Sequence, residues 1–219
     1  MIRERVREIL QSLPEGVILL AATKGRGVDE IIEAVDAGVR VIGENYVQEA
    51  FDKYSKLGKE INGHRVEWHF IGHLQRNKVK RACEIFDMIQ SVDSVKIARE
   101  IDRRCGERGI IMPVLIEVNS GREPNKAGVM PEDVLPLATE IYPLEHLRLA
   151  GVMTMGPRVE NPEDIRPFFQ ITRGVFLELR REFGDDIRYL SMGMTDTWRI
   201  AVEEGANIVR VGRGIFGPR

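Results

Sequence analysis

A single lysine, Lys24, stands just past the carboxyl end of an apolar run at residues 17–22, and glycines follow it at positions 25 and 27. In α/β proteins, ligands bind at the carboxyl ends of the strands. A lysine at that place is expected to face a cleft, where its amine can form a Schiff base with an aldehyde. The alternative is a solvated lysine, which is the common fate of this residue type.

Two glycine-containing segments close to the end of the chain could bind an anion. The segment NIVRVGRGIFG carries Gly212, Gly214 and Gly217, and SMGMTD supplies the hydroxyl groups of Ser191 and Thr195. Bare backbone amides after a strand can cradle a phosphate, and barrels often bind phosphate in the loops after their seventh and eighth strands. Glycines needed only for tight turns are the alternative. Together the two segments predict a phosphate site.

Two polar residues lie where a ligand ring could contact them. Arg210 sits between two valines in the last apolar run, and a charge inside a strand needs a partner. That partner is either a ligand or a barrel carboxylate such as Glu44. Asn45 follows the second predicted strand, where it can cap the next helix, contact a ligand, or do both.

Other motifs argue against several classes of function. His69 and His73 are four residues apart, but across a strand-to-loop junction, and no cysteine or carboxylate completes a metal site. We therefore expect no metal. The basic residues around Lys78 are expected to form a solvated helix face and not a nucleic-acid patch. No GxSxG motif is present to support serine-hydrolase chemistry.

The composition is that of an ordinary globular protein. The 219 residues carry a net charge of −2, so no basic excess points to nucleic acid, and no apolar run is long enough to span a membrane. The amino-terminal segment is charged and amphipathic, unlike a signal peptide. Cys83 and Cys105 lack metal-like spacing, which is typical of a reduced, cytoplasmic protein.

Apolar runs and helical periodicity alternate along the whole chain. A first helix is expected at residues 3–12, and strict β–α alternation then indicates a parallel sheet. The strands are expected at residues 17–22, 39–43, 66–72, 86–92, 112–118, 147–153, 187–190 and 207–211. Eight strands favour one (β/α)8 TIM barrel over residues 1–219, with an extra N-terminal helix, and an open doubly wound sheet is the alternative.

Seven segments occur in order along the chain: ATKGR, GENYVQE, WHFIGHLQRNK, VNSGREPNKAG, GVMTMG, SMGMTD and VRVGRGIFG. With them the chain resembles the YggS/PROSC family, the pyridoxal phosphate homeostasis proteins, over nearly its whole length. Its layout is also similar to the N-terminal barrel domain of alanine racemase. It differs from the usual pattern in SMGMT for SMGMS, which keeps a hydroxyl at Thr195, and in Gly25 where threonine is common.

The resemblance implies pyridoxal 5′-phosphate (PLP) as the cofactor. It implies a Schiff base on Lys24, with Arg210 facing the pyridine nitrogen. The other residues that it places around the cofactor are Ser191 or Thr195 and the backbone around Gly212 and Arg213 at the phosphate, and Asn45 and Met192 near the ring.

The expected function is that of a PLP carrier or regulator with little turnover. An arginine at the ring nitrogen keeps that nitrogen unprotonated, so the ring is a poor electron sink. In alanine racemases a second base comes from a further domain of a partner subunit, for which this chain has no room. We expect a monomer or weak dimer that passes PLP to PLP-dependent apo-enzymes. The alternatives are a racemase with an unusual second base, Tyr46 or His73, and a barrel that binds another phosphate ester non-covalently.

Overall fold

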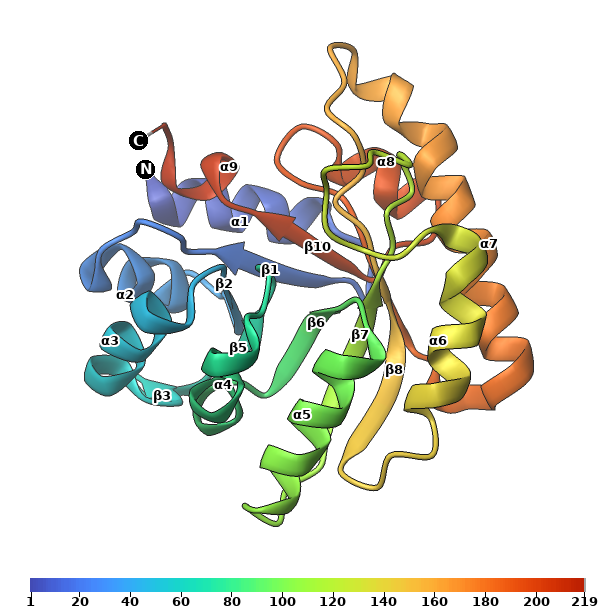
Figure 1. Cartoon of the computed structure of the whole chain (residues 1–219). Coiled ribbons are helices and arrows are strands. Elements are labelled where there is room, and N and C mark those ends of the chain that lie inside the picture. Colours follow the sequence, from blue (N-terminus) through green and yellow to red (C-terminus); the bar gives the residue numbers. More distant parts are fainter. Residues whose placement is uncertain (219) are drawn as a thin grey trace.

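The computed structural model describes residues 1–218, in which eight parallel strands close into a barrel (Figure 1). Going round the barrel, the strand order is β1-β10-β9-β8-β7-β6-β5-β2, so β10 closes the ring against β1. The closed ring confirms the (β/α)8 barrel over the open sheet. The barrel strands are β1 (Ile18–Ala22), β2 (Val41–Glu44), β5 (Glu67–Phe70), β6 (Met88–Val92), β7 (Met112–Glu117), β8 (Leu147–Met153), β9 (Tyr189–Ser191) and β10 (Ile208–Val211).

Helices surround this barrel, and the extra N-terminal helix is present. α1 packs against α2 and α9, which brings the two ends of the described chain side by side (Figure 1). No helix within residues 1–218 is both long and apolar enough to cross a membrane. The helices are α1 (Ile2–Ser12), α2 (Val28–Asp36), α3 (Val47–Leu57), α4 (Val79–Ile85), α5 (Val95–Gly106), α6 (Val134–Ile141), α7 (Arg166–Phe183), α8 (Trp198–Glu203) and α9 (Arg213–Phe216).

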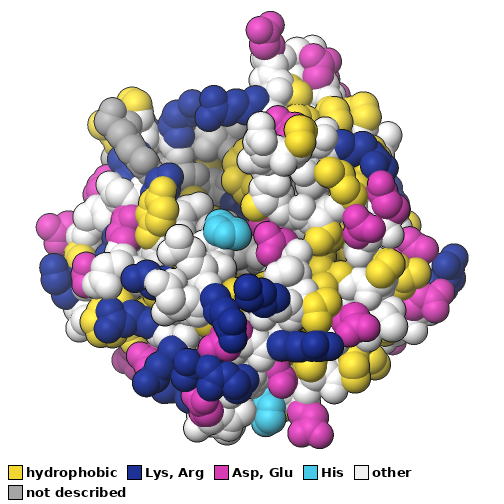
Figure 2. All heavy atoms as spheres, in the orientation of Figure 1, with side chains coloured by type: hydrophobic (Ala, Val, Ile, Leu, Met, Phe, Trp, Pro, Cys, Tyr) yellow, Lys and Arg dark blue, Asp and Glu magenta, His cyan; other side chains and the backbone are white. Residues whose placement is uncertain are grey.

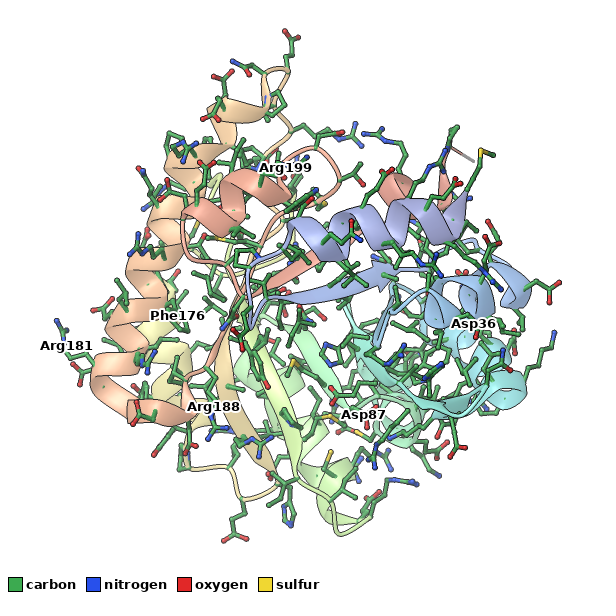
Figure 3. All side chains as sticks on the ribbon, turned by 180° about the vertical axis from the view of Figure 1, so that it is seen from behind. Asp36, Asp87, Phe176, Arg181, Arg188 and Arg199 are labelled. Atoms are coloured by element: carbon green, nitrogen blue, oxygen red, sulfur yellow. The ribbon has the colours of Figure 1, made fainter. Side chains whose placement is uncertain are left out.

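The hydrophobic core has an outer and an inner layer. The outer layer lies between strands and helices, and α7 illustrates it, since Phe176 points toward the strands and Arg181 points away from the molecule (Figure 3). Burial of a large apolar side chain contributes about 1.5–3 kcal/mol. The inner layer fills the barrel, and its fully or nearly buried members are Leu20, Val41, Ile71 and Ile208 in one cluster and Met88, Leu115, Ala150 and Met153 in another.

Closure of the barrel depends on one close backbone approach. Gly151 in β8 has φ +150°, and a Cβ atom there would lie 1.9 Å from the carbonyl oxygen of Tyr189 in β9. The pairing of β7 with β8 also shifts register between Val114 and Leu115. A glycine is therefore required where β8 changes its pairing and meets β9.

Local details differ from the sequence expectations. An antiparallel pair, β3 (Glu60–Ile61) with β4 (His64–Arg65), precedes β5, and two-residue strands are too short to show a period. The expectation that Asn45 caps α3 is wrong, because the chain stays extended through Tyr46, which occupies the N-cap position without a side-chain cap. Asn45 is thereby left at the end of β2.

Candidate functional site

Lys24 lies at the carboxyl-terminal end of the barrel, two residues beyond β1. Since β1 pairs with β10, Lys24 shares a cavity of about 320 Å³ with Arg26, Gly212 and Arg213. Its Nζ lies 4.9 Å from the centre of the Tyr46 ring. Figure 2 shows Lys and Arg side chains at the rim of a hollow in the molecular surface. The structure thus brings Lys24 to the glycine-containing turn after β10.

A buried ion cluster holds the backbone in front of Lys24. Lys53 of α3, which is 6% exposed, donates from Nζ to the carbonyl oxygen of Thr23 over 2.6 Å. The same Nζ donates over 2.7 Å to one carboxylate oxygen each of Glu44 and Glu49. The hydroxyl group of Thr23 donates to the same Glu44 oxygen over 2.5 Å. α3 therefore fixes the end of β1 directly.

The cluster also holds the backbone after Lys24. The amide of Gly25 donates to the Glu49 oxygen that Lys53 contacts, over 2.5 Å. Burial raises the pKa of Glu44, and the nearby ammonium of Lys53 opposes that rise. The second oxygen of Glu44 has no hydrogen-bond partner in the described chain. The backbone on both sides of Lys24, which we call the lysine turn, is consequently held by hydrogen bonds to Lys53 and Glu49, and these two charged groups pair with each other.

Arg210 points into the barrel beneath this site and is 2% exposed. Its Nη1 donates to the hydroxyl oxygen of Ser191 and its Nη2 to the carbonyl oxygen of Thr154, both over 2.7 Å. Its Nε is buried and has no acceptor within residues 1–218. Burial lowers the pKa of Arg210 to about 10, and Glu117 opposes the shift. Arg210 does not form the salt bridge to Glu44 that was the alternative, because Glu44 pairs with Lys53 in the outer layer.

A cavity of about 960 Å³ opens beside Arg210. Glu117, at the end of β7, lines it, and burial together with the charge of Asp93 raises the pKa of Glu117 to about 7. A carboxyl group that titrates near neutrality can hold or release a proton there. Other lining residues come from the loops after β2, β5, β7, β8, β9 and β10 and include Asn45, His73, Ser120, Met194, Thr197 and Arg213.

The loops after β9 and β10 form a bare, narrow turn. The amide of Gly214 donates to the hydroxyl oxygen of Thr195 over 3.1 Å. A Cβ atom on Gly214 would lie 2.8 Å from a methyl group of Val211, and one on Gly212 would lie 3.2 Å from the carbonyl oxygen of Ala22. A side chain at position 214 is therefore excluded and one at position 212 would be crowded, which leaves backbone and a hydroxyl group for an anion.

Comparison with known proteins places the chain in a family. The family model described as alanine racemase, N-terminal domain, matches residues 1–219. A pyridoxal phosphate homeostasis protein of Aquifex aeolicus is 43% identical over 201 residues, which are 92% of this chain and 86% of that protein. The protein of that name from Escherichia coli is 37% identical over 209 residues, 94% and 87% of the two chains. The chain belongs to the pyridoxal phosphate homeostasis protein family.

Solved structures agree with this family. PipY of Synechococcus elongatus with PLP bound is 35% identical, has a TM-score of 0.90, and is matched over 99% of this chain and 100% of its own. An alanine racemase of Clostridium difficile, 17% identical, has a TM-score of 0.78 and is matched over 100% of this chain and 56% of its own. The second likeness shows the shared barrel fold alone.

Within this family fold, most of the residues predicted from the sequence meet at the mouth of the barrel. Lys24, Asn45, Gly212 and Arg213 line the cavities there, and Thr195 contacts the turn after β10. Met192 does not line these cavities: it is fully buried in the outer hydrophobic layer, and its place near the ring stays a prediction. Alternation at the end of β9 turns it toward the helices.

Ser191 lies deeper than the phosphate turn. It is fully buried, and its hydroxyl group accepts from Arg210 and donates to Gln90 on β6 over 2.6 Å. Its hydrogen-bonding capacity is thereby used inside the barrel. Of the two hydroxyl groups predicted for the phosphate, Thr195 is the one beside the bare turn.

Sequence reasoning missed three residues of the site. Met194, in the same SMGMTD segment as Met192, lines the large cavity. Lys53 looks like one more charge on a solvated helix, and Glu117 ends an apolar strand. For Glu117, the one available signal was its position in the strand: alternation along β7 makes this last residue face the inside of the barrel.

Both histidines of the WHFIGH segment have partners within the protein. His69 is buried inside the barrel against Gln90 and Glu67, and His73 lies 3.8 Å from Asp93. No group of three or more His, Cys, Asp or Glu residues within residues 1–218 has the arrangement to hold a metal ion.

Proposed function

We propose that this protein binds PLP, held covalently through the amine of Lys24, and acts in PLP homeostasis as a carrier or regulator. One observation carries the proposal: Lys24 and the bare turn at Gly212 line one cavity at the carboxyl-terminal end of the barrel, and Arg210 lies buried two residues before Gly212. PipY, with PLP bound, supports it through its similarity along the whole chain.

Each group of the site has a separate task. The turn around Gly212 and Arg213, with the hydroxyl group of Thr195, holds the phosphate. Arg210 offers its unpaired Nε–H to the ring nitrogen, and its positive charge disfavours a proton there. When bound, the cofactor supplies an aldehyde carbon with which the amine of Lys24 condenses. Asn45 and Tyr46 flank the ring from the end of β2.

The openness of the mouth suits exchange of the cofactor. The 960 Å³ cavity is lined by loop residues and is large enough to leave room beside a bound PLP. We propose that PLP passes from this site to PLP-dependent apo-enzymes and that the protein acts as a monomer or weak dimer. Cys83 and Cys105 are buried free thiols, which supports a reducing, cytoplasmic setting.

An absorbance titration with PLP tests the proposal. The purified protein should develop the band of a lysine-bound cofactor with saturation at one PLP per chain, and Lys24→Ala should not. Lys78→Ala, an exposed lysine beside the mouth, is the matched control and should titrate like the wild type. Identical spectra for Lys24→Ala and the wild type would refute the covalent site.

A PLP-dependent amino-acid racemase is the second candidate, because Tyr46 lies against Lys24 and could serve as a second base. His73, the other sequence candidate, is 65% exposed and stands beside Asp93. Incubation with L-alanine in heavy water separates the two functions. A carrier leaves the Cα proton nearly unexchanged, whereas a racemase exchanges it with turnover and loses that activity in Tyr46→Phe.

A further inference from the structure

A chain of hydrogen bonds crosses the barrel interior from Arg210 to the opposite end. Arg210 Nη1 donates to Ser191 over 2.7 Å, and Ser191 to Gln90 Oε1 over 2.6 Å. Gln90 Nε2 lies 2.9 Å from His69 Nδ1, and His69 Nε2 lies 3.2 Å from a carboxylate oxygen of Glu67. The inner four residues are at most 2% exposed.

One direction of donation satisfies every member of this chain of hydrogen bonds. A guanidinium only donates, so the Ser191 oxygen accepts, and the single hydroxyl hydrogen is left for Gln90 Oε1. The amide nitrogen of Gln90 then faces His69 Nδ1, which must accept. His69 is therefore neutral with its hydrogen on Nε2, directed at Glu67. A reversed Gln90 amide would leave the Ser191 hydrogen without an acceptor in the chain.

Glu67 selects this direction from the far end of the barrel. It is the first residue of β5, whereas Arg210 lies next to the last residue of β10, so the two stand toward opposite ends of parallel strands. The hydrogen bond from His69 is the main cause that lowers the pKa of Glu67, so Glu67 is a charged acceptor near neutral pH. The Glu67 carboxylate therefore favours the same Nε2–H form of His69 that the amide of Gln90 favours from the other side.

We propose that Glu67, His69 and Gln90 are positioning residues that fix the guanidinium of Arg210 through Ser191. The inference rests on the proposed function, in which Arg210 faces the cofactor ring. It adds that the electronic state of bound PLP depends on a surface carboxylate at the opposite end of the barrel. Buried networks in which every group is satisfied rigidify the groups they hold.

The unloaded protein tests the direction of the chain without any cofactor. Nitrogen-15 NMR of labelled histidine should show His69 as the neutral Nε2–H form in the wild type. Glu67→Ala should convert part of it to the Nδ1–H form with the Gln90 amide reversed. Because the Glu67 side chain is 59% exposed, the fold should tolerate this change. Glu60→Ala, an exposed carboxylate of β3, is the matched control. An Nδ1–H form in the wild type would overturn the proposal.

The loaded protein tests the effect on the cofactor. His69→Leu should weaken PLP binding about three- to tenfold and move its absorbance band, since one buried hydrogen bond is lost and the next group is left unpaired. His69→Asn should restore both, because its amide oxygen can accept from Gln90. Ser91→Ala is the control, since Ser91 is buried on β6 beside Gln90 but its hydroxyl group has no partner in the described chain.

The outcomes separate this inference from the proposed function. No PLP bound by the wild type refutes the proposed function. The positioning role of Glu67, His69 and Gln90 alone is refuted if PLP binds with the same affinity and spectrum to Glu67→Ala, His69→Leu and the two controls. If His69→Leu does not fold, Glu67→Ala decides the matter, with an expected two- to threefold change in affinity and a displaced band.

Discussion

Glu117 is a buried carboxyl group whose pKa is raised by its surroundings. Burial raises its pKa from 4.5 to about 7, so between these values the folded protein binds a proton that the unfolded chain does not. The free energy of unfolding therefore falls as pH rises through this window. We expect Glu117→Gln to reduce the loss of stability between pH 5 and pH 8 by on the order of 2 kcal/mol.

Urea unfolding of both proteins at the two pH values measures this effect. Glu160→Gln changes an exposed carboxylate of the same cavity and should keep the wild-type dependence on pH. Equal slopes for Glu117→Gln and the wild type would show that Glu117 is ionised in the folded protein at pH 5.

Thr195 is the side chain placed to shape the phosphate turn. We expect Thr195→Val to weaken PLP binding about five- to tenfold, because a hydroxyl acceptor for the Gly214 amide and a donor to the anion are both lost. Thr195→Ser should bind like the wild type in the same fluorescence titration. Thr139→Val, on the exposed face of α6, is the control. Equal affinities for Thr195→Val and Thr195→Ser would contradict this role.

Among single residues, the sequence identifies those whose type is unusual for a buried strand. Lys24 and Arg210 were predicted because a charge at the end of, or inside, an apolar run needs a reason. Met192 directly follows β9 and is buried in the outer layer, because one residue of strand phase decides which layer a strand-end side chain enters. The hydrogen-bonded chain from Glu67 to Arg210 runs over four strands, β5, β6, β9 and β10, so no local sequence pattern predicts it.

α3 is the element on which the lysine turn depends. Lys53→Met should lower the free energy of unfolding by about 3–5 kcal/mol, because the buried Glu44 would lose its counter-charge. Lys53→Met combined with Glu44→Gln should recover part of that loss. Chemical denaturation measures both, and Lys56→Met, an exposed position on the same helix, should be neutral. A single variant as stable as Lys56→Met would mean that the cluster does not secure the turn.

Element positions follow from period and run length, and their ends do not. The apolar runs at residues 17–22 and 147–153 are strands, as predicted, because parallel strands are buried on both faces. The start of α3 was misjudged: Asn45 has the chemistry of a cap, but Tyr46 is extended and occupies the N-cap position. A 3-10 turn at Pro162–Ile165 precedes α7, which begins at Arg166.

Closure of the whole barrel depends on a close approach between the backbones of β8 and β9 at Gly151. Gly151→Ala should destabilise the protein by several kcal/mol or prevent folding, since its methyl group would overlap the Tyr189 carbonyl. Gly174→Ala, in α7 with nothing within 4 Å, should stabilise it by roughly 0.5–1 kcal/mol. Thermal unfolding compares the two. A mild effect of Gly151→Ala would mean that β8 and β9 can separate without cost.

Closure of the barrel could be predicted from the number of alternating strands and helices. The positions of the polar residues inside the barrel could not. Eight strands in this length favour a ring, which then dictates that the ends of β1 and β10 are neighbours. That adjacency joins Lys24 to Gly212 across nearly the whole sequence. The polar residues inside the ring depend on stagger and local bulges, as between β7 and β8, which a linear pattern does not encode.

The account stands on the covalent attachment of PLP to one amine. Incubation with PLP, borohydride reduction and mass spectrometry of the peptides measure this attachment directly. The account predicts a phosphopyridoxyl group on Lys24 in the wild type and in Lys78→Ala, and no labelled lysine in Lys24→Ala. Saturating PLP that leaves Lys24 unmodified would contradict it and would favour a barrel that holds a phosphate ester without a covalent bond.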